Sequence, residues 1–270
     1  MTSSPPGSAR KRPAFPAQID GLKPGLASPV QGKVAASIAP PLKMRTVAPV
    51  PTPSGLGLDS HAVRAAMVRK LVEQGLTHSG IQRAFAAVER HRFVDSGLVP
   101  QAYEDTSLPI GLGQTISKPS VVARMLELLL EGRRSPIGRV LEIGTGCGYQ
   151  AALLSHLCNE VYSIERLRGL HERARENLRP FRLPNVHLIL GDGMLGFPSG
   201  GPYAGIISAA GGDSVPQAWL DQLEVGGRLV APAEFSPGKQ SLVVITRTAS
   251  GYTQSVLEPV LFVPLKSGIA

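Results

Sequence analysis

The feature that most constrains the fold is an apolar segment that runs directly into a glycine-rich turn. Residues 140–150 read VLEIGTGCGYQ, with glycines at 144, 146 and 148. Glycine adopts backbone conformations closed to other residues and lets a ligand approach the backbone, because it has no Cβ atom. Residues 151–157 continue as an apolar helix with free N-terminal amides. The pattern predicts a strand, a turn and a helix that bind a nucleotide-type ligand. The alternative is a turn whose glycines serve packing alone.

Downstream of this turn, strand-like and helix-like segments alternate. We expect strands at 139–143, 160–165, 186–190, 203–208 and 228–233, and helices at about 148–157, 168–179 and 215–223. This alternation is typical of a mostly parallel sheet with helices on both faces. Two β-rich segments, 241–248 and 254–263, flank Ala249-Ser250-Gly251 and predict an antiparallel edge hairpin. The fold class is therefore α/β and Rossmann-like.

The residues before the turn divide into two regions. Residues 1–60 contain 11 of the 24 prolines and most of the net charge of +8, so we expect a disordered basic extension over 1–58. Residues 59–270 form the globular domain, in which 59–132 are a helical prelude with a loop and 133–270 carry the sheet. Apolar residues at 63, 67 and 71 predict a helix that ends at Gly75, and further helices are expected after Ser79 and from Pro119. Residues 92–118 are expected to be an apolar loop over the site.

Three carboxylates bear on the identity of the ligand. A dinucleotide-binding turn that starts at Gly144 needs a third glycine at 149, where this chain has Tyr149, so a nicotinamide cofactor is disfavoured. Glu142 lies in the strand before the turn. Glu165 ends the next strand, where a carboxylate can accept hydrogen bonds from both ribose hydroxyls of either cofactor class. Asp192, between two glycines, suits an adenine amino group, and a plain turn is the alternative.

These motifs together resemble protein-L-isoaspartate O-methyltransferases, a family of class I methyltransferases that use S-adenosylmethionine. The resemblance covers residues 61–268. The shared segments are EIGTGCGYQ at 142–150, Glu165, GDG at 191–193, LPIG at 108–111, GQTIS at 113–117 followed by Pro119, and FVPL at 262–265. The GQTIS segment is the most specific, because the glycine turn alone is common to many methyltransferases.

The resemblance implies methyl transfer to the free α-carboxyl of L-isoaspartyl residues in damaged proteins and peptides, which starts repair through a succinimide. It implies a catalytic role for Ser117, whose hydroxyl would orient the carboxylate; a helix N-cap role is compatible with this. The implied cofactor-binding residues are Glu142, Gly144, Gly146, Gly148, Glu165, Asp192 and Gly193. The implied substrate-binding residues are Ile116, Ser117, Ser208, Ala209 and Ala210.

The chain departs from the family pattern at a few positions. Gly211 and Gly212 stand where the family usually has prolines, so we expect a more flexible loop with a looser grip on substrate. Ser208 replaces a usual threonine and keeps the hydroxyl. Cys147 replaces a usual serine, and we expect it to be a buried, inert thiol.

Other partners and functions are less favoured by the sequence. We expect a cytoplasmic protein, because its two cysteines, taken to lie on one helix, are too far apart to pair, and we expect a monomer. We expect no membrane span, no metal site and no specific nucleic-acid partner. Alternatives that stay open are a methyltransferase acting on RNA or a small molecule, a nicotinamide oxidoreductase, and a non-catalytic protein that binds nucleic acid through its basic extension.

Overall fold

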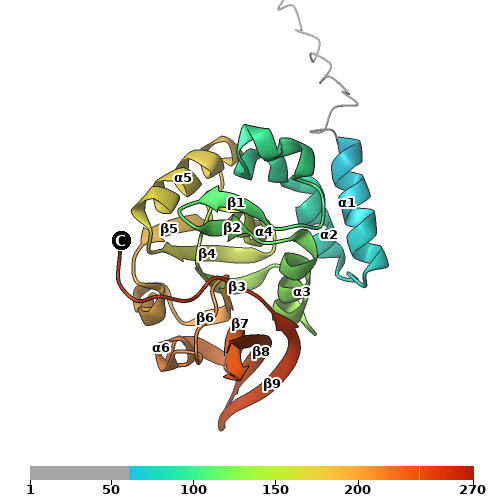
Figure 1. Ribbon diagram of the computed structural model, residues 1–270. Helices are drawn as coiled ribbons and strands as arrows, with labels where there is room; N and C mark the ends of the chain where they lie inside the picture. The colour runs from blue at the N-terminus through green and yellow to red at the C-terminus, as the bar shows by residue number, and fades with distance from the viewer. Residues whose placement is uncertain (1–60, 237) are drawn as a thin grey trace, which may run out of the picture. The chain divides into compact units, whose positions relative to one another are not determined.

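The structure is a computed structural model that describes residues 61–236 and 238–270 (Figure 1). The extension expected over residues 1–58 and the predicted domain start at 59 lie outside the described residues. In the described part of the chain, no helix is long and apolar enough to cross a membrane. Nor do these residues contain a group of three or more His, Cys, Asp or Glu that could hold a metal ion.

Seven of the described strands form one sheet in the order β5-β4-β3-β6-β7-β8-β9. Neighbouring strands from β5 to β7 pair in parallel, and β8 and β9 add an antiparallel edge, which confirms the predicted fold class. The strands are β3 (Ile137–Ile143), β4 (Cys158–Glu165), β5 (Val186–Leu190), β6 (Tyr203–Ser208), β7 (Leu223–Ser236), β8 (Lys239–Thr248) and β9 (Gly251–Val260).

Both faces of the central strands are buried, because successive strand residues belong to two different cores. Val140 joins the larger core with residues of α1 to α5, whereas Leu141 joins a second core that includes Trp219 of α6. Side chains alternate between the faces of a strand, so a strand covered on both faces is mostly apolar. The helices are α1 (His61–Glu73), α2 (Ser79–Ala87), α3 (Pro119–Leu130), α4 (Tyr149–Ser155), α5 (Arg168–Leu178) and α6 (Gln217–Asp221).

The segment expected to be a loop over residues 92–118 is more ordered than that. A 3₁₀ turn, Arg90–Phe93, overlaps its start, and a second 3₁₀ turn, Ser96–Gln101, is followed by a hairpin of β1 (Leu108–Gly111) and β2 (Gln114–Ile116). The hairpin turn holds Leu112 at φ 52 between two glycines with positive φ. Strands of three and four residues are too short to leave a periodic signal, so glycine punctuation alone indicated a loop. In Figure 1 this hairpin lies in front of the central strands.

The chain after β9 forms a strap along the ends of the parallel strands, in red at the left of Figure 1. Gly211 N donates to Val263 O at 2.9 Å, and Leu265 N donates to Gly211 O at 2.7 Å. Gly212 O accepts from Glu234 N of β7 at 3.0 Å. The two glycines are therefore held by backbone hydrogen bonds on two sides, which corrects the expectation of a loose loop. A side chain at Gly211 would meet the end of Gln240, within 2.6 Å.

The two cysteines differ in one respect from the expectation. Both are buried free thiols, but Cys158 opens β4 instead of lying on the helix that follows Cys147. Burial raises the pKa of the Cys147 thiol to about 11, which agrees with an inert role for this residue.

Candidate active site

The glycine turn joins β3 to α4 and uses conformations that favour glycine. Gly144, Gly146 and Gly148 have φ values of 87°, 57° and 92°, a region where other residues are strained. Gly144 N and Thr145 N both donate to Ile164 O of β4, at 2.9 and 3.1 Å. The turn is therefore fixed to the neighbouring strand at the carboxyl edge of the sheet, where α/β folds bind ligands.

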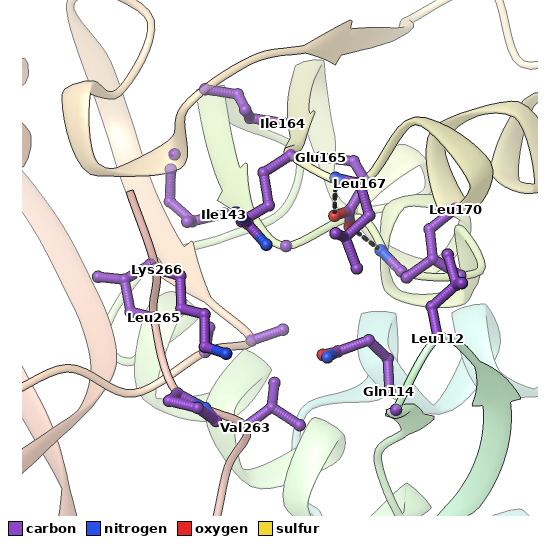
Figure 2. Close-up of a pocket in the computed structure, with 18 of the residues that line it drawn as sticks. Leu112, Gln114, Ile143, Ile164, Glu165, Leu167, Leu170, Val263, Leu265 and Lys266 are labelled. Carbon is purple, nitrogen blue, oxygen red and sulfur yellow. Dashed lines mark hydrogen bonds between the residues drawn. The ribbon is translucent and has the colours of Figure 1, made fainter. Parts of the chain in front are cut away.

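Glu165, the last residue of β4, lies against this turn. Its Oε2 accepts from Gly146 N at 2.9 Å, and its Oε1 accepts from Leu167 N at 2.9 Å, as the dashed lines of Figure 2 show. The residue is only 5% exposed. Each carboxylate oxygen keeps a second lone pair, so the carboxylate can accept further hydrogen bonds from two adjacent hydroxyls.

A cavity of about 440 Å³ opens in front of Gly144, Gly146 and Glu165. Its volume suits a nucleoside-sized ligand. Its walls combine apolar and polar groups, and Gln114 of β2 and Lys266 of the strap reach into it from opposite sides in Figure 2. We call it the donor cavity; its lining also includes Ile110, Leu112, Ile143, Ile164, Leu167, Leu170, Gly193, Ala209, Ala210, Val263, Pro264 and Leu265.

Glu142 lies beneath the turn instead of in the wall of the donor cavity. It is fully buried, and its Oε2 accepts from Ser163 Oγ, which also lies 2.6 Å from Thr145 Oγ1. Burial raises the pKa of Glu142 to about 8, and the hydrogen bond from Ser163 opposes this only in part. A contact between Glu142 and a ligand, expected from the motif, has no support in this geometry. The residue supports the turn from below.

Gly148 and Asp192 also lie outside the cavity wall. Gly148 precedes α4, where an added Cβ would come within 3.0 Å of Leu178 of α5. Asp192 Oδ1 accepts from Met194 N at 2.9 Å, and its Oδ2 accepts from Gly268 N at 2.7 Å. Asp192 therefore ties its own turn to the strap, whereas the neighbouring Gly193 does line the cavity.

A second cavity of about 710 Å³ contains Ser117 in its lining. We call it the acceptor cavity. It shares Thr115, Ala209 and Val263 with the donor cavity, so the two spaces adjoin at these residues. Its lining is completed by Ser107, Lys118, Val121, Pro259, Val260, Leu261 and Phe262. Leu261 is 91% exposed at this surface.

Of the other residues expected to bind the substrate, some line the two adjoining cavities and some are buried in the interior. Ala209 lines both cavities and Ala210 lines the donor cavity. Ile116 is 4% exposed, and Ser208 is fully buried with its hydroxyl donating to Ala210 O at 2.8 Å. Both are thus positioned to support the walls. Ser117 is not the N-cap of α3, since Lys118 holds that position and Asp105 Oδ1 accepts from Ser120 N at 2.8 Å.

Sequence reasoning missed several lining residues from the hairpin and the strap. Leu112, Gln114, Val263 and Lys266 are the main ones. Gln114 and Val263 belong to the motif segments, and Leu112 and Lys266 lie next to them, but nothing in the sequence indicated that both segments face one cavity. The described residues that line the two cavities include no cysteine or histidine, so the lining offers no nucleophile of the Cys–His or Ser–His type. Its chemistry is that of holding and orienting ligands.

Comparison with known proteins gives a consistent result. The family model for protein-L-isoaspartate(D-aspartate) O-methyltransferase matches residues 62–270. A protein-L-isoaspartate O-methyltransferase from Methylibium petroleiphilum is 52% identical over 272 residues, which cover 97% of this chain and 99% of the relative. A protein of the same name from Leptothrix cholodnii is 58% identical over 221 residues, or 80% of this chain and 77% of the relative.

Two solved structures are also similar to the chain. One protein-L-isoaspartate O-methyltransferase has a TM-score of 0.69 and 29% identity, and covers 76% of this chain and 67% of its own. A putative enzyme of this name from Plasmodium falciparum, in complex with S-adenosyl-L-homocysteine, has a TM-score of 0.65 and 23% identity. That match covers 75% of this chain and 98% of the Plasmodium chain, and it supports the fold.

Proposed function

The chain belongs to the protein-L-isoaspartate(D-aspartate) O-methyltransferase family, and we propose that it methylates isoaspartyl residues at the junction of its two cavities. The methyl donor occupies the donor cavity, and the α-carboxylate of the isoaspartyl residue enters the acceptor cavity beside Ser117. The observation that carries this proposal is that the two cavities share Thr115, Ala209 and Val263. Group transfer requires that two ligands meet within near-contact distance.

The donor cavity fits S-adenosylmethionine by the chemistry of its lining. Glu165 offers two carboxylate oxygens, held by Gly146 N and Leu167 N, to the hydroxyls of the ribose. Ile143, Ile164 and Gly193 offer apolar and close-approach surface to the adenine ring. When bound, this group supplies an electrophilic methyl on a sulfonium. Three other residues predicted to bind the cofactor have supporting roles. Glu142 and Gly148 support the glycine turn, and Asp192 supports the strap.

The substrate carboxylate in the acceptor cavity has to be oriented but does not have to be activated. A carboxylate is ionised at neutral pH, so it is already a nucleophile and requires no general base. Ser117 can donate its hydroxyl proton to one carboxylate oxygen and leave the other to face the donor cavity. A carboxylate and a sulfonium lose their charges as they react, so a cavity with few waters favours the reaction.

The substrate class follows from which carboxylate is free. In an isoaspartyl residue the chain continues through the β-carboxyl, and the α-carboxyl becomes a free anion next to the backbone. We propose damaged proteins and peptides with such residues as substrates; the methyl ester then closes to a succinimide, which reopens partly to normal aspartate. We further expect a cytoplasmic monomer; the two free buried thiols support a reducing compartment.

A pair of matched peptides tests this function. One peptide contains an isoaspartyl residue and its twin contains a normal aspartyl residue at the same position. The measurement is transfer of labelled methyl from S-adenosylmethionine to each. We expect base-labile label on the isoaspartyl peptide alone. Equal labelling of both peptides, or of neither, would overturn the substrate assignment.

A further inference from the structure

Arg90, in the 3₁₀ turn Arg90–Phe93, is a fully buried arginine close to the acceptor cavity. Its Nε donates to Ala102 O at 2.8 Å, and its Nη2 donates to Thr106 O at 3.3 Å and to Ser117 O at 2.8 Å. Ala102 and Thr106 precede the β1–β2 hairpin and Ser117 follows it. One guanidinium therefore closes the base of the hairpin and fixes the backbone of Ser117.

The same guanidinium also contacts the donor side. Its Cζ lies 4.9 Å from the centroid of the Tyr149 ring. Tyr149 is fully buried and is the first residue of α4, directly after Gly148 of the glycine turn. A cation over an aromatic face is attracted to it. Arg90 thus connects the segment that begins α4 to the segment that carries Ser117.

The charge of Arg90 is not neutralised by an ion pair among the described residues. Each described salt bridge involves other cations, and Arg90 instead donates to neutral carbonyls. Burial lowers the pKa of Arg90, and Asp105 raises it only as the weakest of several causes. A guanidinium starts from so high a pKa that it keeps its proton at neutral pH. A buried charge is screened less than a surface charge, so its field extends to an adjoining cavity.

We propose that Arg90 is a positioning and specificity-determining residue: it fixes Ser117 through the Ser117 carbonyl, and its unpaired charge favours an anionic acceptor beside Ser117. This inference rests on the proposed function. In this proposal the substrate carboxylate contacts Ser117, and the charge of Arg90, which lies behind Ser117, attracts the carboxylate without touching it. A neutral ligand of the same shape would gain from the position of Ser117 but not from the charge of Arg90.

Three variants separate charge, geometry and mere stability. Arg90→Lys keeps a charge but loses the fork of donors, and Arg90→Met removes both. Arg92→Met is the matched control, because Arg92 lies in the same turn, is paired with Glu89, and its side chain is 48% exposed. The wild type is first assayed on the isoaspartyl peptide; if it does not methylate it, the proposed function fails and the test of Arg90 ends there.

Given an active wild type, kinetics on the isoaspartyl peptide distinguish the roles. We expect Arg90→Met to raise KM about tenfold and to lower kcat, since it loses both field and geometry. Arg90→Lys should keep KM within about threefold while kcat falls about tenfold, because a lysine restores charge without the fork. Arg92→Met should match the wild type. Affinity for S-adenosylhomocysteine should change little in all three.

A neutral ligand distinguishes an electrostatic role of Arg90 from a purely structural one, because a structural role would affect the acid and the amide equally. The isoasparaginyl twin of the peptide has an α-carboxamide in place of the α-carboxylate. With S-adenosylhomocysteine bound, calorimetry should show that Arg90→Met weakens binding of the acid about tenfold more than binding of the amide, because the amide loses only the positioning of Ser117. Equal losses for acid and amide would overturn the electrostatic role. The electrostatic role would also be overturned if Arg90→Lys raised KM as much as Arg90→Met does.

Discussion

At the scale of single residues, the site depends on a few side chains whose direction decides their role. Glu142 and Ile143 are neighbours on β3, yet Ile143 lines the donor cavity and Glu142 does not, because side chains alternate along a strand. Of the residues that the motif predicts to bind the cofactor, Gly144, Gly146, Gly193 and Glu165 line the donor cavity. The motif could not indicate that Glu142 and Asp192 would be engaged by Ser163 and Gly268 N instead. These hydrogen bonds are made with residues that are distant in the sequence.

Ser117 gives the first prediction at this scale. Removing its hydroxyl in Ser117→Ala should lower kcat on an isoaspartyl peptide about 10- to 100-fold, the value of a hydrogen bond to a charged group. Affinity for S-adenosylhomocysteine should stay within about twofold, since Ser117 lines only the acceptor cavity. Ser107→Ala is the control, because Ser107 lines the same cavity and is exposed. Unchanged turnover with a large loss of cofactor affinity would contradict the role.

Glu142 gives a prediction for the pH dependence of stability. Its pKa is raised by burial from 4.5 to about 8, so the folded state holds a proton that the unfolded state releases at lower pH. The stability from this proton is fully present below about pH 4.5 and is lost as pH rises to about 8. The slope reaches about 1.4 kcal/mol per pH unit. In Glu142→Gln this loss should disappear. Denaturant unfolding across this range measures it, and parallel curves for both proteins would contradict it.

At the scale of secondary-structure elements, the parallel strands were predictable and their accessories were not. The alternation of strand-like and helix-like segments predicted β3 to β7, and the apolar runs 161–164 in β4 and 186–190 in β5 suited strands covered on both faces. The β1–β2 hairpin gave no such signal, because it is short and its turn depends on Leu112 at φ 52. The strap after β9 is held in part by backbone hydrogen bonds with Gly211, Arg166 and Arg168. Backbone bonds carry no residue signature, so sequence patterns cannot show them.

The meeting of α4 and α5 at Gly148 gives the prediction at this scale. Gly148→Ala forces a side chain into φ 92 and brings its Cβ within 3.0 Å of Leu178. We expect a loss of about 1–3 kcal/mol in the free energy of unfolding, from strain and overpacking. Gly97→Ala is the control, because nothing lies within 4 Å of its Cβ and its φ is not positive. Equal stability of the two variants in chemical denaturation would contradict this reading of Gly148.

At the scale of the described domain, the site is assembled from segments far apart in the sequence. The glycine turn and Glu165 come from the sheet, Gln114 and Ser117 from the hairpin region, and Val263 from the strap. The sheet supplies the glycine turn and Glu165 to the donor cavity, whereas the hairpin and the strap contribute walls to both cavities. The described residues that line the acceptor cavity include none from the glycine turn, so the turn alone indicates a class of cofactor and not a substrate.

The crystal structure of a ternary complex tests the central claim most directly. The complex contains the protein, S-adenosylhomocysteine and an isoaspartyl peptide, which cannot react without a methyl donor. We predict that the ribose hydroxyls of S-adenosylhomocysteine lie within hydrogen-bond distance of the Glu165 carboxylate. The peptide α-carboxylate should lie within hydrogen-bond distance of Ser117 Oγ. The sulfur and that carboxylate should face each other beside Thr115, Ala209 and Val263. A peptide carboxylate bound away from Ser117, or a ribose bound away from Glu165, would contradict it.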